Sequence, residues 1–175
     1  MNIIPTPLKD AVIIEPKVFG DARGFFMETW NQQAFAAAGL PINFVQDNHS
    51  RSTQGILRGL HYQTLQTQGK LVRVTHGKVF DVAVDLRQSS PSFGQWFGVE
   101  LSDENQRMFW VPPGFAHGFY VMSESADFIY KCTDFYAPQA EHSILWDDPS
   151  LAIQWPIPSG QAPKLSAKDA NGVLF

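Results

Sequence analysis

Residues 107–122 read Arg-Met-Phe-Trp-Val-Pro-Pro-Gly-Phe-Ala-His-Gly-Phe-Tyr-Val-Met. The two halves, 107–111 and 115–122, are apolar and aromatic runs that favour β-strands, and Pro112-Pro113-Gly114 between them predicts a tight turn. The same alternation of apolar runs and turn residues continues in both directions along the chain. Further short runs rich in Val, Ile, Phe, Tyr and Trp, bounded by Gly, Pro, Asp or Ser, predict strands near residues 11–18, 25–30, 43–48, 55–63, 70–75, 78–86, 93–101 and 126–133.

Signals for helices are few. Residues 32–38 are rich in Ala and Gln and end at Gly39-Leu40-Pro41, which predicts one short helix, and residues 103–107 could form a single turn. So many strands with so little helix between them cannot form a parallel sheet, because each parallel crossover needs about a dozen residues or more. We therefore predict one all-β domain over residues 1–175, an antiparallel jelly roll or barrel, with the loop-like tail 156–175 as a cover.

The composition excludes several classes of protein. The 175 residues carry a formal net charge of −4 and no block of Lys and Arg, which argues against nucleic-acid binding, because phosphates need a basic surface. No apolar run has the length of a transmembrane helix or a signal peptide, so we expect a cytoplasmic protein without membrane association. The single cysteine, Cys132, can form neither an internal disulfide nor a Cys-rich zinc site. Neither a phosphate-binding glycine loop nor a Gly-x-Ser-x-Gly nucleophile elbow is present.

The turn at Pro112–Gly114 belongs to a larger motif. The spacing Pro112-x-Gly114-x-x-His117 resembles the signature of cupins, in which the histidine faces the interior of a β-barrel. In metal-binding cupins this histidine joins an upstream His-x-His motif and a glutamate. Here the upstream stretch is His61-Tyr62-Gln63, with glutamine in place of the second histidine and no glutamate at ligand distance. The motif therefore predicts the cupin fold without a catalytic metal.

His61 is a candidate for chemistry because of its surroundings. A histidine in an apolar strand is usually a hydrogen-bonded core residue, and this alternative stays open. Arg58 lies in the same strand, however, and buried charge needs a partner or an anionic ligand. Strict alternation places His61 and Gln63 on one face of the strand and Arg58 on the other. A bulge at Gly59 would be needed to bring Arg58 and His61 into one cavity.

Other polar residues interrupt apolar strands. Lys70, Asp81 and Tyr130 each have an ordinary structural alternative, such as an edge-strand charge or a half-buried tyrosine with a hydrated hydroxyl group. Collected inside one barrel, they would supply a cation, a carboxylate and a phenol beside the imidazole of His61. Together these groups form a set suited to acid–base catalysis.

The sequence also resembles the dTDP-4-dehydrorhamnose 3,5-epimerases of deoxysugar biosynthesis. The resemblance covers about residues 10–170 and rests on seven blocks in the family's order, at 20–28, 44–50, 57–63, 69–73, 79–85, 113–119 and 165–170. It implies a cupin-type jelly-roll β-barrel with few short helices, usually a homodimer whose subunits exchange arms. It also implies inversion of C3 and C5 of dTDP-4-dehydro-6-deoxy-D-glucose, giving dTDP-4-dehydro-L-rhamnose, without a cofactor. Residues 64–68 are the least similar part, and we expect them to affect loop contacts only.

The resemblance also implies roles for individual residues. It makes His61 the general base, Asp169 its hydrogen-bonding carboxylate, Tyr130 the acid on the opposite face of the sugar, and Lys70 the cation beside the C4 oxygen. The implied substrate-binding residues are Arg23 (from the partner subunit), Phe26, Glu28, Gln46, Asn48, Arg58, Lys70, His117 and Tyr136. Asp81 falls in the same pocket without an assigned role.

The residue types fit proton transfer next to a ketone. An imidazole with a pKa near ~6.5 can accept a proton near neutral pH, a carboxylate can orient it, and a lysine can stabilise the enolate oxygen. Rival hypotheses are a relative that inverts only C3 or acts on another dTDP-4-keto sugar, a cupin that only binds a ligand or metal, and a purely structural barrel. Tyr130 favours inversion at two carbons, because reprotonation from the far face needs an acid there.

Overall fold

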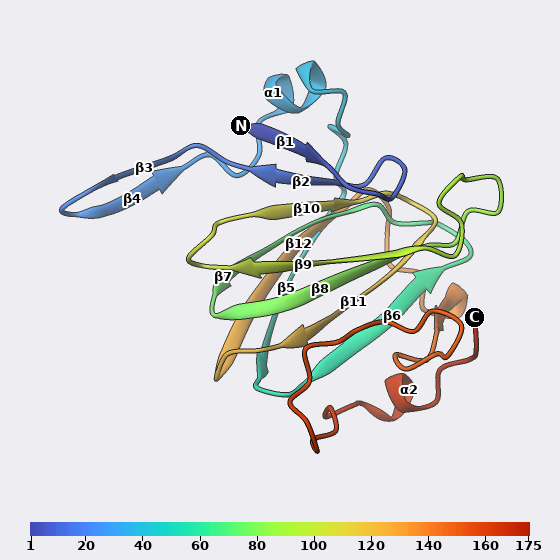
Figure 1. Ribbon diagram of the computed structural model, residues 1–175. Coiled ribbons are helices and arrows are strands. Elements are labelled where there is room, and N and C mark those ends of the chain that lie inside the picture. Colours follow the sequence, from blue (N-terminus) through green and yellow to red (C-terminus); the bar gives the residue numbers. More distant parts are fainter.

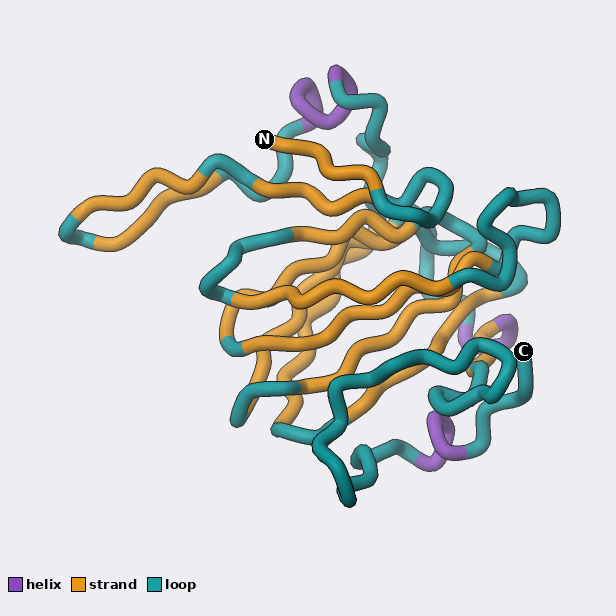
Figure 2. Tube along the Cα trace, in the orientation of Figure 1, coloured by secondary structure: helices purple, strands orange, loops and turns teal.

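The computed structural model describes all residues from 1 to 175 and consists of two antiparallel sheets that face each other as a barrel (Figures 1 and 2). The larger sheet has the order β1 (Asn2–Pro5), β2 (Val12–Glu15), β10 (Met108–Val111), β7 (Lys70–His76), β12 (Ser125–Cys132) and β5 (Gln46–Thr53). The smaller has the order β13 (Glu141–Ser143), β6 (Leu57–Gln63), β11 (Phe115–Val121), β8 (Lys78–Asp85) and β9 (Trp96–Ser102). The cupin-type jelly roll predicted from the sequence is confirmed.

Most predicted strands are present, and the differences have local causes. The strand predicted near 11–18 is two strands, β2 and β3 (Val18–Asp21), because Pro16 between them has no N–H to donate to a sheet. The proline-interrupted N-terminus forms β1, an edge strand, where Pro5 can lie at the end without loss of a sheet hydrogen bond. Residues 103–107 form a turn without a helix.

The space between the two sheets is filled at one end only. Inward-facing residues of alternating positions form the central core, including Val72 and Phe128 from the larger sheet and Val79 and Phe119 from the smaller. The rings of Phe119 and Phe128 stack across the barrel with centroids 4.2 Å apart. At the opposite end, where β6 ends and β7 begins, polar residues replace this core and leave a cavity.

The outer faces of both sheets are covered in part by other segments of the chain. Helix α1 (Gln32–Ala37), capped by Asn31, packs Phe35 on the larger sheet, and the predicted helix at 32–38 is thus confirmed. Ile144, Leu151 and Ile153 cover the smaller sheet. The C-terminal tail runs beside β6 and includes α2 (Ala167–Ala170), which no sequence pattern predicted (Figure 1). Neither helix has the length and apolar character needed to cross a membrane.

A hairpin of β3 and β4 (Gly24–Met27) projects from the barrel (Figure 1). Nearly all residues of its two strands are exposed, and these include aromatic residues: Phe25 is 61% and Phe26 is 70% exposed. Exposed aromatic side chains on an extended arm are typical of segments that contact another chain.

Candidate active site

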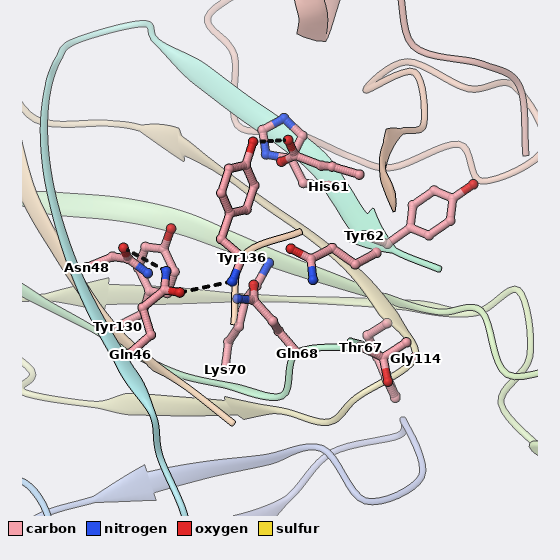
Figure 3. Close-up of a pocket in the computed structure, with 13 residues that line it drawn as sticks. Gln46, Asn48, His61, Tyr62, Thr67, Gln68, Lys70, Gly114, Tyr130 and Tyr136 are labelled. Atoms are coloured by element: carbon pink, nitrogen blue, oxygen red, sulfur yellow. Dashed lines mark hydrogen bonds between the residues drawn. The ribbon is translucent and has the colours of Figure 1, made fainter. Parts of the chain in front are cut away.

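The cavity at the open end of the barrel has a volume of about 310 Å³ and is lined mostly by polar side chains (Figure 3). Its walls come from both sheets. Six residues predicted from the sequence lie on these walls: Gln46, Asn48, His61, Lys70, Tyr130 and Tyr136. This size is at the lower end of the range for small-molecule sites, and the polar lining suits a substrate with many oxygen atoms.

His61 and Asp169 form a hydrogen-bonded pair on one wall. His61 lies on β6, and its Nε2 is 2.6 Å from Oδ1 of Asp169, which is buried in α2. Because an ionised carboxylate only accepts hydrogen bonds, Nε2 carries a hydrogen, and in the neutral ring Nδ1 of His61 keeps a free lone pair. Asp169 also accepts hydrogen bonds from the Ser166 hydroxyl group (2.7 Å) and the Gly59 N–H (3.2 Å). Burial alone would raise the pKa of Asp169, but these hydrogen bonds outweigh it and hold the pKa below its usual value.

A bulge in β6 brings Arg58 to the same face as His61. In the pairing with β11, His61 lies opposite His117 but Arg58 lies opposite Phe119, so one extra residue is present on β6. Nε of Arg58 donates to Oγ of Ser52 (3.0 Å), and the buried Ser52 side chain belongs to the inward face of β5. The bulge predicted at Gly59 is therefore present, but Arg58 is exposed and is not among the residues that line the cavity.

Lys70 and Tyr130 lie on the larger sheet and thus face His61 across the cavity. Burial raises the pKa of Tyr130 to about 12, and the nearby Cys132 and Glu141 act in the same direction. Burial lowers the pKa of Lys70, although Cys132, Glu141 and Asp81 oppose this shift. No carboxylate forms an ion pair with Lys70, so its ammonium group is available to an oxygen atom in the cavity.

Two side-chain amides on β5 line the cavity on the same sheet as Lys70 and Tyr130. Oε1 of Gln46 accepts the backbone N–H of Tyr136 (3.0 Å), and Nε2 of Gln46 donates to Oδ1 of Asn48 (3.1 Å), as Figure 3 shows. Nδ2 of Asn48 in turn donates to Sγ of the buried Cys132 (3.6 Å). These contacts hold both amides against the cavity.

Comparison with known proteins agrees with this geometry. The family model described as dTDP-4-dehydrorhamnose 3,5-epimerase matches residues 5–175. The chain belongs to this family. A dTDP-4-dehydrorhamnose 3,5-epimerase from Pseudomonas aeruginosa is 61% identical over 96% of this chain and 92% of its own length. The chain is an epimerase, and the family assignment from the sequence is confirmed.

Solved structures of related epimerases superpose closely. The dTDP-6-deoxy-D-glucose-3,5-epimerase from Legionella pneumophila, crystallised with dTDP-4-keto-L-rhamnose, is 59% identical with a TM-score of 0.95, covering 99% of this chain and 92% of that one. A 3'-monoepimerase from Streptomyces bikiniensis, in complex with dTDP-quinovose, is 33% identical with a TM-score of 0.91, covering 98% and 86%. The fold is therefore shared by enzymes that differ in the number of carbons inverted.

Three predicted substrate-binding residues of this epimerase lie away from the cavity. Arg23, Phe26 and Glu28 belong to the projecting hairpin or directly follow it. The Arg23 side chain is 90% exposed and pairs with Asp21, whose carboxylate lies 2.6 Å from Nη2. Within one chain these residues are not brought together with His61.

His117 and Asp81 lie behind the cavity wall. Nε2 of His117 is 3.0 Å from both carboxylate oxygens of Asp81, and both side chains are buried between the sheets. His117, predicted as a substrate-binding residue, is not on the cavity wall itself. Of the two histidine–aspartate pairs formed by histidines of β6 and β11, His61–Asp169 and His117–Asp81, only the His61 pair faces the cavity. No group of three or more His, Cys, Asp or Glu side chains is arranged as a metal site.

Several residues of the cavity were not predicted from the sequence. Thr67 and Gln68 line it, so the expectation that residues 64–68 affect loop contacts only is wrong. No local sequence pattern indicates that this loop contributes side chains to the cavity. Glu141 also lines the cavity, accepts the Tyr136 hydroxyl group (2.7 Å) and pairs with Lys168 (2.5 Å). Because Glu141 lies in a strand of three residues, no strand pattern indicated its orientation.

Proposed function

We propose that this epimerase inverts C3 and C5 of dTDP-4-dehydro-6-deoxy-D-glucose with His61 as the base and Tyr130 as the acid. The product is dTDP-4-dehydro-L-rhamnose. The observation that carries the assignment is the placement of the two side chains on opposite sheets of one cavity. Inversion of a carbon requires that a proton leaves from one face and another arrives at the opposite face, so the base and the acid must face each other.

In the first step, Nδ1 of His61 removes the proton on C3 or C5, the electrons of the C–H bond form a double bond to C4, and the π electrons of the C4 carbonyl group move to its oxygen. Asp169, held at Nε2, keeps the imidazole in the required tautomer and stabilises the imidazolium ion that forms. The enolate oxygen then carries negative charge beside the unpaired ammonium group of Lys70. A preorganised cation in a largely dry cavity typically contributes about 10²–10³ in rate.

In the second step, the Tyr130 hydroxyl group gives its proton to the opposite face of the same carbon. A pKa of about 12 keeps this phenol protonated at neutral pH, yet it is still a stronger acid than the C–H bond that it forms. His61 and Tyr130 then exchange protons with solvent before the second carbon is presented. The reaction as written uses no cofactor.

The nucleotide part of the substrate is assigned to the remaining polar residues. Arg58, Gln46 and Asn48 bind the diphosphate, because guanidinium and amide N–H groups are suited to phosphate oxygens. Tyr136 packs on the thymine ring at the cavity mouth. His117 supports the floor of the site from behind.

A second chain completes the site in this proposal. The hairpin of β3 and β4 extends from the barrel and exposes Phe25 and Phe26, which supports an exchange of arms between two copies in a homodimer (Figure 1). Arg23, Phe26 and Glu28 of one copy then contact the substrate bound by the other. A nucleotide sugar is made from a cytoplasmic nucleotide, so the enzyme is assigned to the cytoplasm.

Complementation between two inactive variants tests this exchange. His61→Ala and Arg23→Ala are each expected to lose activity, and mixed dimers should regain it, because one of their two sites receives an intact His61 and an intact Arg23. If Arg23 served the site of its own chain, both sites of a mixed dimer would stay inactive.

The 3'-monoepimerase relative suggests a second candidate, inversion at C3 alone. Its 33% identity, against 61% for the two-carbon enzyme from Pseudomonas aeruginosa, favours inversion at both carbons. Proton NMR in D2O with dTDP-4-dehydro-6-deoxy-D-glucose and EDTA decides between them. Loss of both the C3 and C5 proton signals supports the two-carbon reaction, loss at C3 alone supports the second candidate, and no exchange contradicts both.

A further inference from the structure

Gln63 occupies the position at which metal-binding cupins have the second histidine of their His-x-His motif; the residue is only 9% exposed and is among the residues that line the cavity. The amide makes an unusual number of contacts. Nε2 is 2.8 Å from the Gln66 carbonyl oxygen, 3.2 Å from that of Phe135 and 3.3 Å from that of Leu65, while Oε1 accepts the Ala137 N–H at 3.1 Å. Two amide hydrogens thus serve three carbonyl groups, and one of these hydrogens is shared.

These contacts connect two separate loops to β6. Leu65 and Gln66 belong to the loop that follows β6 and carries Thr67 and Gln68 to the cavity wall. Phe135 and Ala137 flank Tyr136, so the amide of Gln63 forms hydrogen bonds with the backbone on both sides of that residue. The Tyr136 N–H is itself held by Gln46, at 3.0 Å. Two glutamine side chains therefore hold the backbone around Tyr136, while Glu141 holds its hydroxyl group.

We propose that Gln63 is a positioning residue for substrate binding, which holds Tyr136 and the 64–68 loop in the arrangement that receives the nucleotide. This inference rests on the role proposed above for Tyr136. The glutamine amide supplies two donor hydrogens and one acceptor at this distance from the backbone. Glutamate would direct a second acceptor at three carbonyl oxygens, and methionine would leave all four backbone groups without their partner.

The direct test is amide hydrogen exchange of segment 133–137. Gln63→Met is expected to accelerate exchange of the Ala137 N–H by about tenfold or more, since this N–H loses its acceptor. Gln63→Glu serves as a second variant if Gln63→Met fails to fold: it keeps an acceptor for Ala137 but loses the donor to the Phe135 carbonyl oxygen, so it is read by faster exchange of the neighbouring Tyr136 N–H. The matched control is Gln54→Met, which removes a glutamine that donates to the Met122 carbonyl oxygen far from the cavity. Unchanged exchange in both Gln63 variants would overturn the proposal.

The functional test is a double-mutant cycle with Tyr136→Ala, read by calorimetric binding of dTDP. Gln63→Met alone should weaken dTDP binding by about tenfold, as expected for lost buried hydrogen bonds, and raise KM with kcat changed less than about threefold. In the Tyr136→Ala background the same substitution should have less than about a twofold effect on dTDP affinity. Additive effects, or loss of kcat without a change in KM, would contradict a role through Tyr136.

The two proposals fail in different ways. If Tyr136→Ala alone left dTDP affinity unchanged, the assignment of Tyr136 to the thymine ring would be wrong. The hydrogen-exchange result for Gln63 would still decide whether Gln63 holds the loop.

Discussion

His61 and His117 lie opposite each other on β6 and β11, and each ring meets a buried carboxylate through Nε2. The two rings differ in their exposure to the cavity. The His61 side chain is 27% exposed and lines the cavity, whereas the His117 side chain is 8% exposed and lies under Phe128 and Asp81. A histidine–aspartate pair can therefore transfer protons at His61, which lines the cavity, and support the cavity wall at His117, which is buried.

Replacement of His61 should separate chemistry from binding. His61→Ala is expected to lower kcat by about 10³-fold or more, because no other imidazole lines the cavity, while dTDP affinity changes less than about threefold. Steady-state kinetics and calorimetry check both values. Retention of more than a few per cent of kcat would remove His61 as the base.

Replacement of Tyr130 should affect the two half-reactions unequally. Tyr130→Phe keeps the ring that packs near Phe128 but removes the proton donor, so product formation should fall by about 10²-fold or more while proton loss at C3 continues. Deuterium incorporation followed by NMR measures both rates in one sample. Equal losses in both rates would argue against Tyr130 as the acid.

Deprotonation of Lys70 should set the alkaline limit of activity. Burial lowers the pKa of Lys70, and a cationic form that stabilises the enolate is present below that pKa and lost as the pH rises through it. Tyr130, with a pKa of about 12, stays protonated throughout this range. Lys70→Arg should move the alkaline limb of kcat to higher pH, because guanidinium stays charged, whatever its absolute rate. A limb that does not move would assign the titration to another group.

At the level of elements, β6 carries much of the active site. Its bulge places Arg58 and His61 on one face, its Gly59 N–H donates to Asp169, and its last residue holds two loops. The bulge depends on glycine for two reasons. Gly59 has φ +107°, and a Cβ atom there would lie 2.6 Å from the His117 carbonyl oxygen and 2.7 Å from Cα of Gly118. Both neighbours are backbone and cannot move away easily.

Two glycine substitutions separate these reasons. Gly39, after α1, also has a positive φ of +69°, but a Cβ atom added there would have no other atom within 4 Å. Gly39→Ala should lower the unfolding free energy by about 1 kcal/mol, the cost of placing a Cβ atom on a residue with positive φ. Gly59→Ala should cost clearly more and also lower kcat, because the His61–Asp169 pair moves with the bulge. Thermal unfolding and kinetics of the two variants provide the comparison, and equal stability losses would contradict the steric argument.

Across the molecule as a whole, a buried carboxylate ties the N-terminal segment to the barrel. Asp85, at the end of β8, accepts hydrogen bonds from Arg87, Ser90 and Ser92, and Nη1 of Arg87 reaches Asp10 at 3.0 Å. Burial alone would raise the pKa of Asp85, but these donors outweigh it and hold the pKa well below its usual range. That all 175 residues fold as one domain stays a prediction, and this network is a physical reason to expect it.

Asp85→Asn is expected to lower the unfolding free energy by roughly 3 kcal/mol near pH 7, as for a broken buried ion pair. A depressed carboxyl pKa stabilises the fold above the unfolded value of about 4, and this stabilisation is lost as the pH falls toward the folded value. The difference in melting temperature between wild type and variant should therefore shrink below about pH 4. Asp21→Asn is the control, since Asp21 and Arg23 repeat the same Asp-x-Arg contact at the surface, where a much smaller loss is expected. Equal effects of the two substitutions would show that burial of Asp85 is unimportant.

The strand pattern, the antiparallel class, the family and most of the polar side chains that line the cavity could all be predicted from the chain alone. These features depend on neighbours along the sequence: the turn at Pro112–Gly114, the alternation within each strand, and motifs such as Arg58–Gln63 and Ser166–Asp169. The requirement for a bulge near Gly59 could also be derived, because strict alternation keeps Arg58 and His61 apart.

Other features became visible only in the folded chain: which of two histidines faces the cavity, that Thr67, Gln68 and Glu141 line it, and that Gln63 contacts both sides of Tyr136. Each of these depends on the distance between segments that are far apart in sequence, such as Gln63 and Ala137. Loops have no periodic pattern that reports where their side chains point, and burial is set by packing of the whole barrel. The types of chemical group in the active site could therefore be predicted from the sequence. Their arrangement in space could not, because it is determined by the packing of the folded barrel.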